Sequence, residues 1–444
     1  MSCPTNPAAN TLAAGAIIAF ASVWLRGSAV SALDFGSDEG RRDSTIAYTE
    51  GLRTYDNVKK YGAERVDDRD RQMFLPDGIR AGEYLVFPSL AAKAIYDDNI
   101  FTQPGRKTGD LSEELTPSVR LSSQFPNHIL DMAVKARVVH FNEHSGLDYV
   151  DGSASVDGAF HFDHAHTLAA SVLTSFEHDD RADPEAPKNA AEFVPLFHNR
   201  ATLGLTRDAG RLYGTFSGTV ESWRYQNVKA FDGSTINESA RNLEVYTAEA
   251  KVGYRFSPGF EWQSKLRVLR NENSTAISQS NWGYEALSGL SLESNPLVRW
   301  HVLAGFALRD YDRTAFGTTS ATLLEGRLQW LATQNMTVYV TGRRELASDV
   351  TASGKGRIDN TIKGRIEYEV LRNLVLTGTG GFIAAQYEGA DRDDRSVVAG
   401  LGLQYFHTKN ILLTADYEYL HRTSTMSEFN LDRNKYGIGV KIRF

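Results

Sequence analysis

The sequence predicts an all-β protein, a single transmembrane antiparallel β-barrel of about 18 strands, with about 16 as the alternative. Three features predict this fold. From Tyr84 onward, apolar and polar residues alternate in one segment after another. Short and long connections between these segments also alternate. Residues 433–444 form a last alternating segment that ends in an aromatic residue. Each feature is typical of a sheet with one apolar face and one polar face.

The alternation is clearest in residues 361–370, where Ile362 and Ile366 oppose Lys363 and Arg365. Successive side chains of a strand point to opposite faces. A Lys or Arg facing the middle of a bilayer costs about 2–4 kcal/mol, so in a barrel the charged face must line the interior. A soluble sandwich has the same pattern with the faces exchanged and stays open as an alternative. In the barrel, the predicted pore-lining residues are Asp131, Lys135, Arg137, Glu249, Lys251, Arg255, Lys265, Arg267, Arg327, Lys363, Arg365, Glu367, Asp416 and Glu418.

The connections are of two kinds. Tight turns are predicted at residues 124–127, 163–165, 208–210, 257–259, 294–296, 333–335, 371–373 and 407–409. Between them lie longer polar loops, among them residues 102–109, 179–192, 229–239, 271–279, 310–319 and 346–356. Outer-membrane barrels have short periplasmic turns and longer external loops. Propeller blades contain about four strands each and carry repeated motifs, which this sequence lacks.

The last segment resembles the C-terminal signal strand of bacterial outer-membrane barrels, which closes the barrel and ends in Phe at the periplasmic rim. An ordinary last strand of a soluble β-domain is the alternative. Small and charged residues occupy one face of the segment. The predicted barrel-closing residues occupy the other face, and they are Tyr436, Ile438, Val440, Ile442 and Phe444.

Composition excludes several classes of protein. The chain has 444 residues, of which 23% are charged, and its mean hydropathy is −0.35. A helical membrane protein needs runs of about 20 apolar residues, which are absent from the sequence. The net charge of −7 is spread over mixed acids and bases, so the basic surface of a nucleic-acid-binding protein is not indicated. Cys3 is the only cysteine, which excludes an internal disulfide.

The N-terminal part differs from the rest. Residues 11–25 are apolar and are followed by Val30-Ser31-Ala32, so residues 1–32 are predicted to be a signal peptide cleaved after Ala32. A buried soluble helix is the alternative. Residues 33–83 are rich in Arg, Asp and Glu and are predicted to be a polar leader, either loose in the periplasm or inserted into the lumen. Residues 84–444 are predicted to form the barrel.

The segment that leads into the first strand resembles the putative β-barrel porin 2 family of Gram-negative bacteria. It has a Gly78-Ile79-Arg80 leader, then Phe87-Pro88-Ser89-Leu90, then YDDNIF at residues 96–101. The resemblance implies a location in the bacterial outer membrane and an outer-membrane barrel without an assigned substrate. It also implies outer-membrane lipids and the barrel-assembly machinery as partners. Some members of the family are encoded among genes for exopolysaccharide production, which suggests glycan passage. Polysaccharide-export components therefore stay open as further partners.

No catalytic, cofactor or metal site is predicted. The sequence has no Gly-x-Ser-x-Gly motif, phosphate loop or zinc-ligand spacing. The histidines of HFDHAH at residues 161–166 span a predicted tight turn and are interpreted as surface residues rather than metal ligands. Glu367 and Glu369 alternate with Lys363 and Arg365, which favours neutralising ion pairs over an acid–base pair.

Three function classes follow from these predictions. The first is a passive channel for small polar solutes or a conduit for polysaccharide export, with weak ion selectivity because both signs of charge line the interior. The second is a non-conducting scaffold or adhesin that acts through its external loops. The third is a barrel hydrolase. Aromatic residues near strand ends, among them Trp223 and Tyr387, are either interface girdles or ordinary half-buried strand residues.

Overall fold

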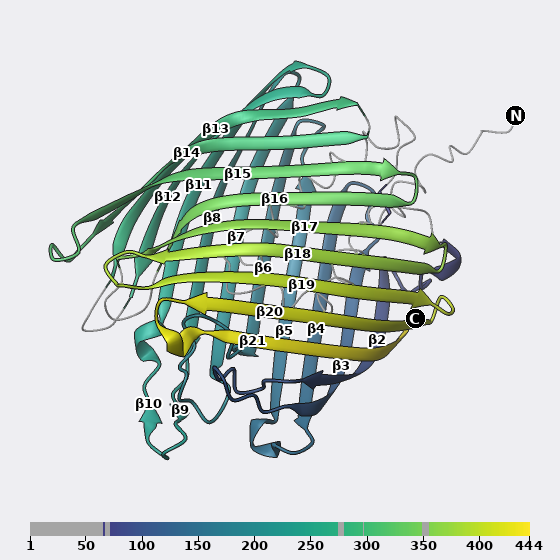
Figure 1. Cartoon of the computed structure of the whole chain (residues 1–444). Coiled ribbons are helices and arrows are strands. Elements are labelled where there is room, and N and C mark those ends of the chain that lie inside the picture. Colours follow the sequence, from purple (N-terminus) through teal and green to yellow (C-terminus); the bar gives the residue numbers. More distant parts are fainter. Residues whose placement is uncertain (1–64, 67–71, 274–278, 296, 349–354) are drawn as a thin grey trace, which may run out of the picture.

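The structure is a computed structural model that describes residues 65–66, 72–273, 279–295, 297–348 and 355–444 (Figure 1). The predicted signal peptide, its cleavage after Ala32 and most of the predicted leader lie outside the described residues. Most of the described chain is β-strand. The helical segments among these residues are four short 3-10 turns, η1 (Gln72–Phe74), η2 (Ser145–Leu147), η3 (Ser239–Arg241) and η4 (Ser427–Phe429). Within the described residues, no helix has the length and apolar character needed to cross a bilayer.

Eighteen long strands form the barrel. They are β2 (Tyr84–Asp97), β3 (Asp110–Ser123), β4 (His128–Phe141), β5 (Tyr149–His161), β6 (His166–His178), β7 (Pro195–Ala209), β8 (Leu212–Tyr225), β11 (Leu243–Ser257), β12 (Phe260–Glu272), β13 (Asn281–Asn295), β14 (Val298–Tyr311), β15 (Thr318–Thr333), β16 (Met336–Ala347), β17 (Arg357–Leu371), β18 (Leu374–Tyr387), β19 (Asp393–Phe406), β20 (Ile411–Ser424) and β21 (Leu431–Arg443). Three shorter strands are β1 (Ile79–Ala81), which extends β2, and the hairpin of β9 (Val228–Lys229) and β10 (Thr235–Ile236).

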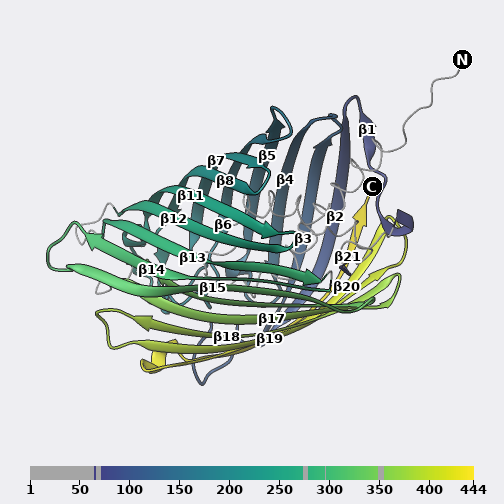
Figure 2. The same cartoon turned by 90° about the horizontal axis from the view of Figure 1, so that it is seen from above.

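The strands pair antiparallel with their neighbours in the chain, and the sheet closes because β21 pairs with β2. In the closing pair, Ala92 lies opposite Val440 and Leu90 lies opposite Ile442. Figure 2 shows the ring of strands from above. The predicted closed barrel of 18 antiparallel strands is therefore confirmed.

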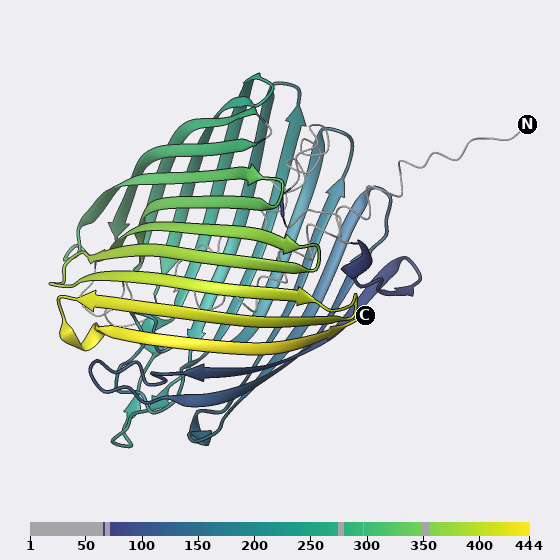
Figure 3. The same ribbon diagram turned by 45° about the vertical axis from the view of Figure 1, so that its right-hand side comes forward.

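The two ends of the barrel differ. Tight turns, such as residues 210–211 and 372–373, join the strands at the end where the C-terminus lies, and long connections, such as 179–194 and 226–242, join them at the other end. Figure 3 shows the C-terminus at the tight-turn end of β19, β20 and β21. In the turn before β12, Gly259 has a φ of 80°, and a Cβ at this position would collide with the carbonyl oxygen of Glu293.

The exterior of the barrel is apolar. Phe306, Leu401 and Ile438 lie in the middle of their strands with exposed fractions of 72%, 66% and 67%. Soluble monomers rarely expose continuous apolar surfaces of this kind, whereas a lipid-facing surface requires them. The opposite face of the same strands carries the charged and small residues, so the alternation in the sequence corresponds to an apolar exterior and a polar interior.

The aromatic residues do not all follow the girdle interpretation. Trp223 and Tyr387 are almost fully buried on the inner face. The Trp223 ring stacks on the His198 ring with 5.2 Å between centroids, and the guanidinium of Arg392 lies 4.3 Å from the Tyr387 ring. These two aromatics pack against cations and rings of the interior, which the strand-end position in the sequence does not reveal.

Candidate functional site

The inner wall holds charged side chains in close contact. Arg267 of β12 bridges Glu249 of β11 and Glu285 of β13 at 2.7 Å each, and Arg309 of β14 contacts Glu285 at 2.6 Å. All four side chains are buried. Neighbouring strands thus contribute alternating charges to one ladder. A buried charge without a partner is strongly destabilising, so each member depends on the next.

The structure brings some predicted pore-lining residues together. Glu249 and Arg267 are two members of the ladder, and Arg365 contacts Glu367 at 2.5 Å. Other predicted residues pair with partners that the sequence did not indicate, because these partners lie on other strands. These pairs are Lys265–Glu325 at 2.8 Å, Asp416–Lys93 at 2.8 Å, Arg255–Asp208 at 2.7 Å and Arg137–Asp151 at 2.9 Å.

The remaining predicted residues lie on the same face of their strands as these pairs. They are Asp131, Lys135, Lys251, Arg327, Lys363 and Glu418. Asp131 is buried, and Lys135 and Glu418 line a cavity of the interior. Whether these residues line a conducting pore stays a prediction.

The connection between β6 and β7, residues 179–194, lies inside the barrel; we call it the inner loop. The Asp180 carboxylate accepts two hydrogen bonds from Arg433 of β21, at 2.8 and 3.0 Å, and lies 3.4 Å from the Lys435 ammonium. Burial raises the pKa of the Asp180 carboxyl, but the charges of Arg433 and Lys435 outweigh it and hold that pKa well below its ordinary value. These contacts fix the inner loop to β21, which is far in the sequence from β6 and β7.

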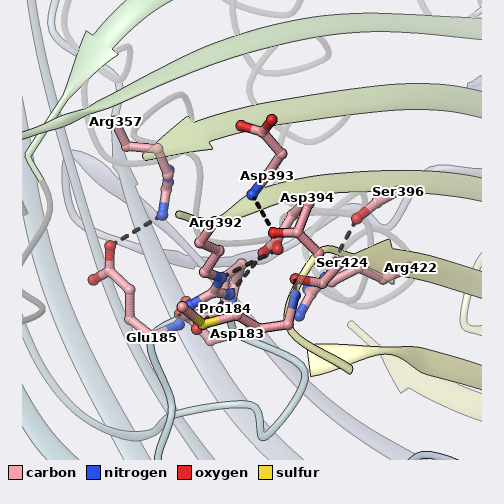
Figure 4. Close-up of polar contacts among 12 residues, drawn as sticks. Asp183, Pro184, Glu185, Arg357, Arg392, Asp393, Asp394, Ser396, Arg422 and Ser424 are labelled. Atoms are coloured by element: carbon pink, nitrogen blue, oxygen red, sulfur yellow. Dashed lines mark hydrogen bonds and ion pairs between the residues drawn. The ribbon is translucent and has the colours of Figure 1, made fainter. Parts of the chain in front are cut away.

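Further contacts hold the inner loop against the wall formed by β17 to β20. Arg357 contacts Glu185 at 3.0 Å, and Arg422 donates a hydrogen bond of 2.6 Å to the carbonyl oxygen of Ala182, which is 0% exposed. Arg392 donates a hydrogen bond of 3.1 Å to the carbonyl oxygen of Pro184. Figure 4 shows these arginine side chains around the loop.

The sequence itself makes the inner loop compact. Asp180 accepts a hydrogen bond from the backbone N–H of Ala182 at 2.9 Å, and Asp183 does the same for Glu185 at 2.7 Å. Such local side-chain bonds replace the ladder bonds that a strand would make. The long polar loop predicted at residues 179–192 is present at the long-connection end, but it folds into the barrel instead of projecting outward. The sequence shows only that these residues are polar. It does not show that their partners are arginines of distant strands.

Two cavities lie in the part of the interior that the structure describes. A cavity of about 170 Å³ borders the inner loop and is lined by side chains that include Glu185, Glu221 and Arg241. A cavity of about 700 Å³ lies toward the tight-turn end and is lined by β2 to β6 and β17 to β21. Charged and hydroxyl side chains line both cavities, so water and small polar molecules can occupy them.

Part of the chain before β2 also lies against the inner wall. Val66 is 1% exposed, and its backbone N–H donates to the Thr337 hydroxyl at 3.0 Å. It packs with Phe406 and Leu412, and Arg443 donates a hydrogen bond of 2.6 Å to the carbonyl oxygen of Phe74. These contacts lie at the tight-turn end. Val66 and Phe74 of the predicted leader thus contact the wall of the barrel.

Known proteins that are similar to this chain include one family and several solved structures. The family model described as Putative beta-barrel porin 2 matches residues 72–444. Among solved structures, the chain is similar to OpdL of Pseudomonas aeruginosa, with 12% identity, a TM-score of 0.45, and coverage of 82% of this chain and 100% of that one. It is also similar to the outer membrane protein OpdK of Pseudomonas aeruginosa, with 11% identity, a TM-score of 0.43, and coverage of 81% and 98%. No curated protein matches the sequence.

Proposed function

Because the chain belongs to the putative β-barrel porin 2 family and forms a closed barrel, we propose that it is an outer-membrane channel through which small polar solutes diffuse. The family and the barrel support a channel. The choice of small solutes rests on the interior. The inner loop crosses from β6 and β7 to β17, β20 and β21 and therefore occupies part of the interior.

The observation that carries this proposal is the ion pair between Asp180 and Arg433. An ion pair in the interior is weakly screened and is held by two charge-assisted hydrogen bonds. It keeps the inner loop in the path of any solute. A rigid constriction of this kind favours small molecules over a polymer chain, so polysaccharide export is the less supported of the two transport functions.

Liposome swelling tests the proposal. Liposomes that contain the refolded protein are placed in isotonic solutions of arabinose, sucrose, raffinose or a dextran polymer. We expect fast swelling with arabinose, slower swelling with the larger sugars and none with dextran. Equal rates with all four solutes would favour a wide conduit such as a polysaccharide exporter. The absence of swelling with every solute would favour the non-conducting scaffold.

A further inference from the structure

Four cations gather on the inner wall at the tight-turn end, and we call them the basic patch: Arg120, Lys135, Lys441 and Arg443. They come from β3 and β21, which flank β2, and from β4, which lies beyond β3. In the register, Arg443 and Ser118 both lie opposite Ser89 on β2, and Lys135 lies opposite Ser118. All four cations line the cavity of about 700 Å³. The four cations therefore face the same cavity.

The basic patch differs from the other inner-wall cations because carboxylates do not neutralise it. Within the described residues, Lys135 and Lys441 form neither an ion pair nor a side-chain hydrogen bond. Arg120 lies over the Phe87 ring at 5.0 Å, and its buried Nε has no hydrogen-bond partner. Arg443 donates only to backbone carbonyl oxygens.

The acids that the structure describes around the same cavity form no ion pair with the patch, although Glu114 and Glu177 lie close enough to Lys135 to attract its charge. Asp416 is bound by Lys93 at 2.8 Å, and Glu114 accepts a hydrogen bond from Thr116 at 3.0 Å. Glu177 lies at the long-loop end of β6 and Glu418 in the middle of β20. Asp131 of β4 lies opposite Ser122, two residues along β3 from Arg120, and the Asp131 and Arg120 side chains do not form an ion pair. The patch thus keeps a net positive charge on the cavity wall.

Small residues lie between the cations. The inner face of β2 carries Ser89 and Ala91 there, and the hydroxyl oxygens of Ser89 and Ser118 are 2.7 Å apart. Neighbouring strands are about 4.8 Å apart, so the backbones of Lys441 and Lys135 are separated by roughly 15 Å along the wall. The long cationic side chains therefore flank a shallow, hydroxyl-lined space.

We propose that the basic patch is a binding site for small solutes with oxyanionic groups, either carboxylate or phosphate. Unpaired cations on one wall of a cavity repel one another, and an anion that binds between them offsets this repulsion with charge-assisted hydrogen bonds. Ser89 and Ser118 supply further donors. The inference deepens the proposed channel function, because it names the class of solute that the larger cavity retains.

Ion currents through the refolded protein in planar bilayers test the inference. Succinate and inorganic phosphate are the probes for the two oxyanion types, and glucose is the neutral control. We expect millimolar succinate or phosphate to reduce the chloride current and a KCl gradient to give an anion-selective reversal potential. In the variant Lys135→Gln/Lys441→Gln, we expect about tenfold weaker block per removed cation and loss of anion selectivity.

A matched control removes two opposite charges, which form an ion pair, from the same cavity. The variant Lys93→Gln/Asp416→Asn leaves the net charge unchanged, so block and selectivity should stay as in the natural protein. The heat-dependent gel mobility of both variants shows whether the barrel has folded. Equal block of the natural protein and the Lys135→Gln/Lys441→Gln variant, or a cation-selective natural channel, would overturn the inference. The stronger of the two blockers identifies the preferred oxyanion.

The inference and the channel function can fail separately. A channel that conducts without preference for anions refutes the basic patch and leaves the channel intact. If no current is observed, isothermal titration of the detergent-solubilised protein with succinate and with phosphate tests the patch alone. Binding that the double lysine variant loses then supports the site in a barrel that does not conduct. Absence of heat in both titrations refutes it.

Discussion

Asp180 and Arg433 are 253 positions apart in the sequence, yet two hydrogen bonds of 2.8 and 3.0 Å join their side chains inside the barrel. This relationship ties the inner loop to the last strand. Because β21 also closes the sheet against β2, the same strand both completes the wall and holds the loop across the interior. This pair acts together with the contacts of Arg357 and Arg422 to hold the inner loop across the interior.

The first prediction concerns this pair. Asp180→Asn removes the negative charge that binds Arg433 and Lys435, so the inner loop should become mobile and single-channel conductance should rise. A loop acid with only local partners serves as control, since Asp232 lies in the connection that contains β9 and β10 and bonds to Ser234. Asp232→Asn should leave conductance unchanged. Equal conductance of the natural protein and Asp180→Asn would show that the loop does not limit the current.

The second prediction concerns pH. Burial and the nearby charges of Arg422 and Arg392 lower the pKa of Lys188, in the inner loop, to about 8. Its pKa in an unfolded chain is about 10.4. The docked loop therefore favours neutral Lys188, and docking strengthens as the pH rises through 8.

We expect conductance to be higher and noisier at pH 7 than at pH 10.5, with the change developing between about pH 8 and 10.4. Current recordings across this range give the titration curve. Lys188→Met keeps the apolar stem of the side chain and removes the titrating group, so this pH-dependent change should disappear. An unchanged pH dependence in this variant would assign it to another group.

The third prediction concerns the two faces of the wall. Leu401 is 66% exposed on the outside of β19, and Thr379 of β18 lines the larger cavity. Leu401→Arg should lower the free energy of unfolding in lipid by about 2–4 kcal/mol, because the charge faces the bilayer. Thr379→Arg places the same side chain in the interior and should cost much less. Denaturant titration in liposomes compares them, and equal losses would contradict the assignment of faces.

The fourth prediction concerns the buried ladder. Arg267→Gln leaves Glu249 and Glu285 without their shared cation and should lower the free energy of unfolding by about 3–5 kcal/mol. The double variant Arg267→Gln/Glu249→Gln should recover part of this loss, because Glu285 keeps its contact with Arg309 at 2.6 Å. Equal stability of the single and double variants, measured by denaturant titration, would mean that Glu249 is not charged in the folded barrel.

The barrel could be predicted from the sequence because its determinants are local. Alternation of side chains assigns each residue to a face, and the cost of a charge in lipid selects which face points outward. For example, Ile362 and Lys363 are adjacent in the sequence and therefore point to opposite faces of the strand. The closing pair also follows from pattern, since the segment that contains Ile438 is apolar on one face like all the others.

The arrangement of the interior could not be predicted in the same way. Parity places a charge inside, but it does not name the partner. Asp180 and Arg433 are distant in sequence and meet only because the barrel is closed. The polarity of residues 179–192 fits an external loop equally well, and nothing local distinguishes a loop that folds inward. The neutralising pair of Arg365 and Glu367 could be inferred because its members are neighbours on one strand.

The central claim is that the chain forms a closed, water-filled barrel that conducts. Single-channel recording of the refolded natural protein in a planar bilayer tests this most directly. Our account predicts discrete current steps in KCl whose size increases in the Asp180→Asn variant. A natural protein and a variant that both insert into the bilayer without any current steps would contradict it.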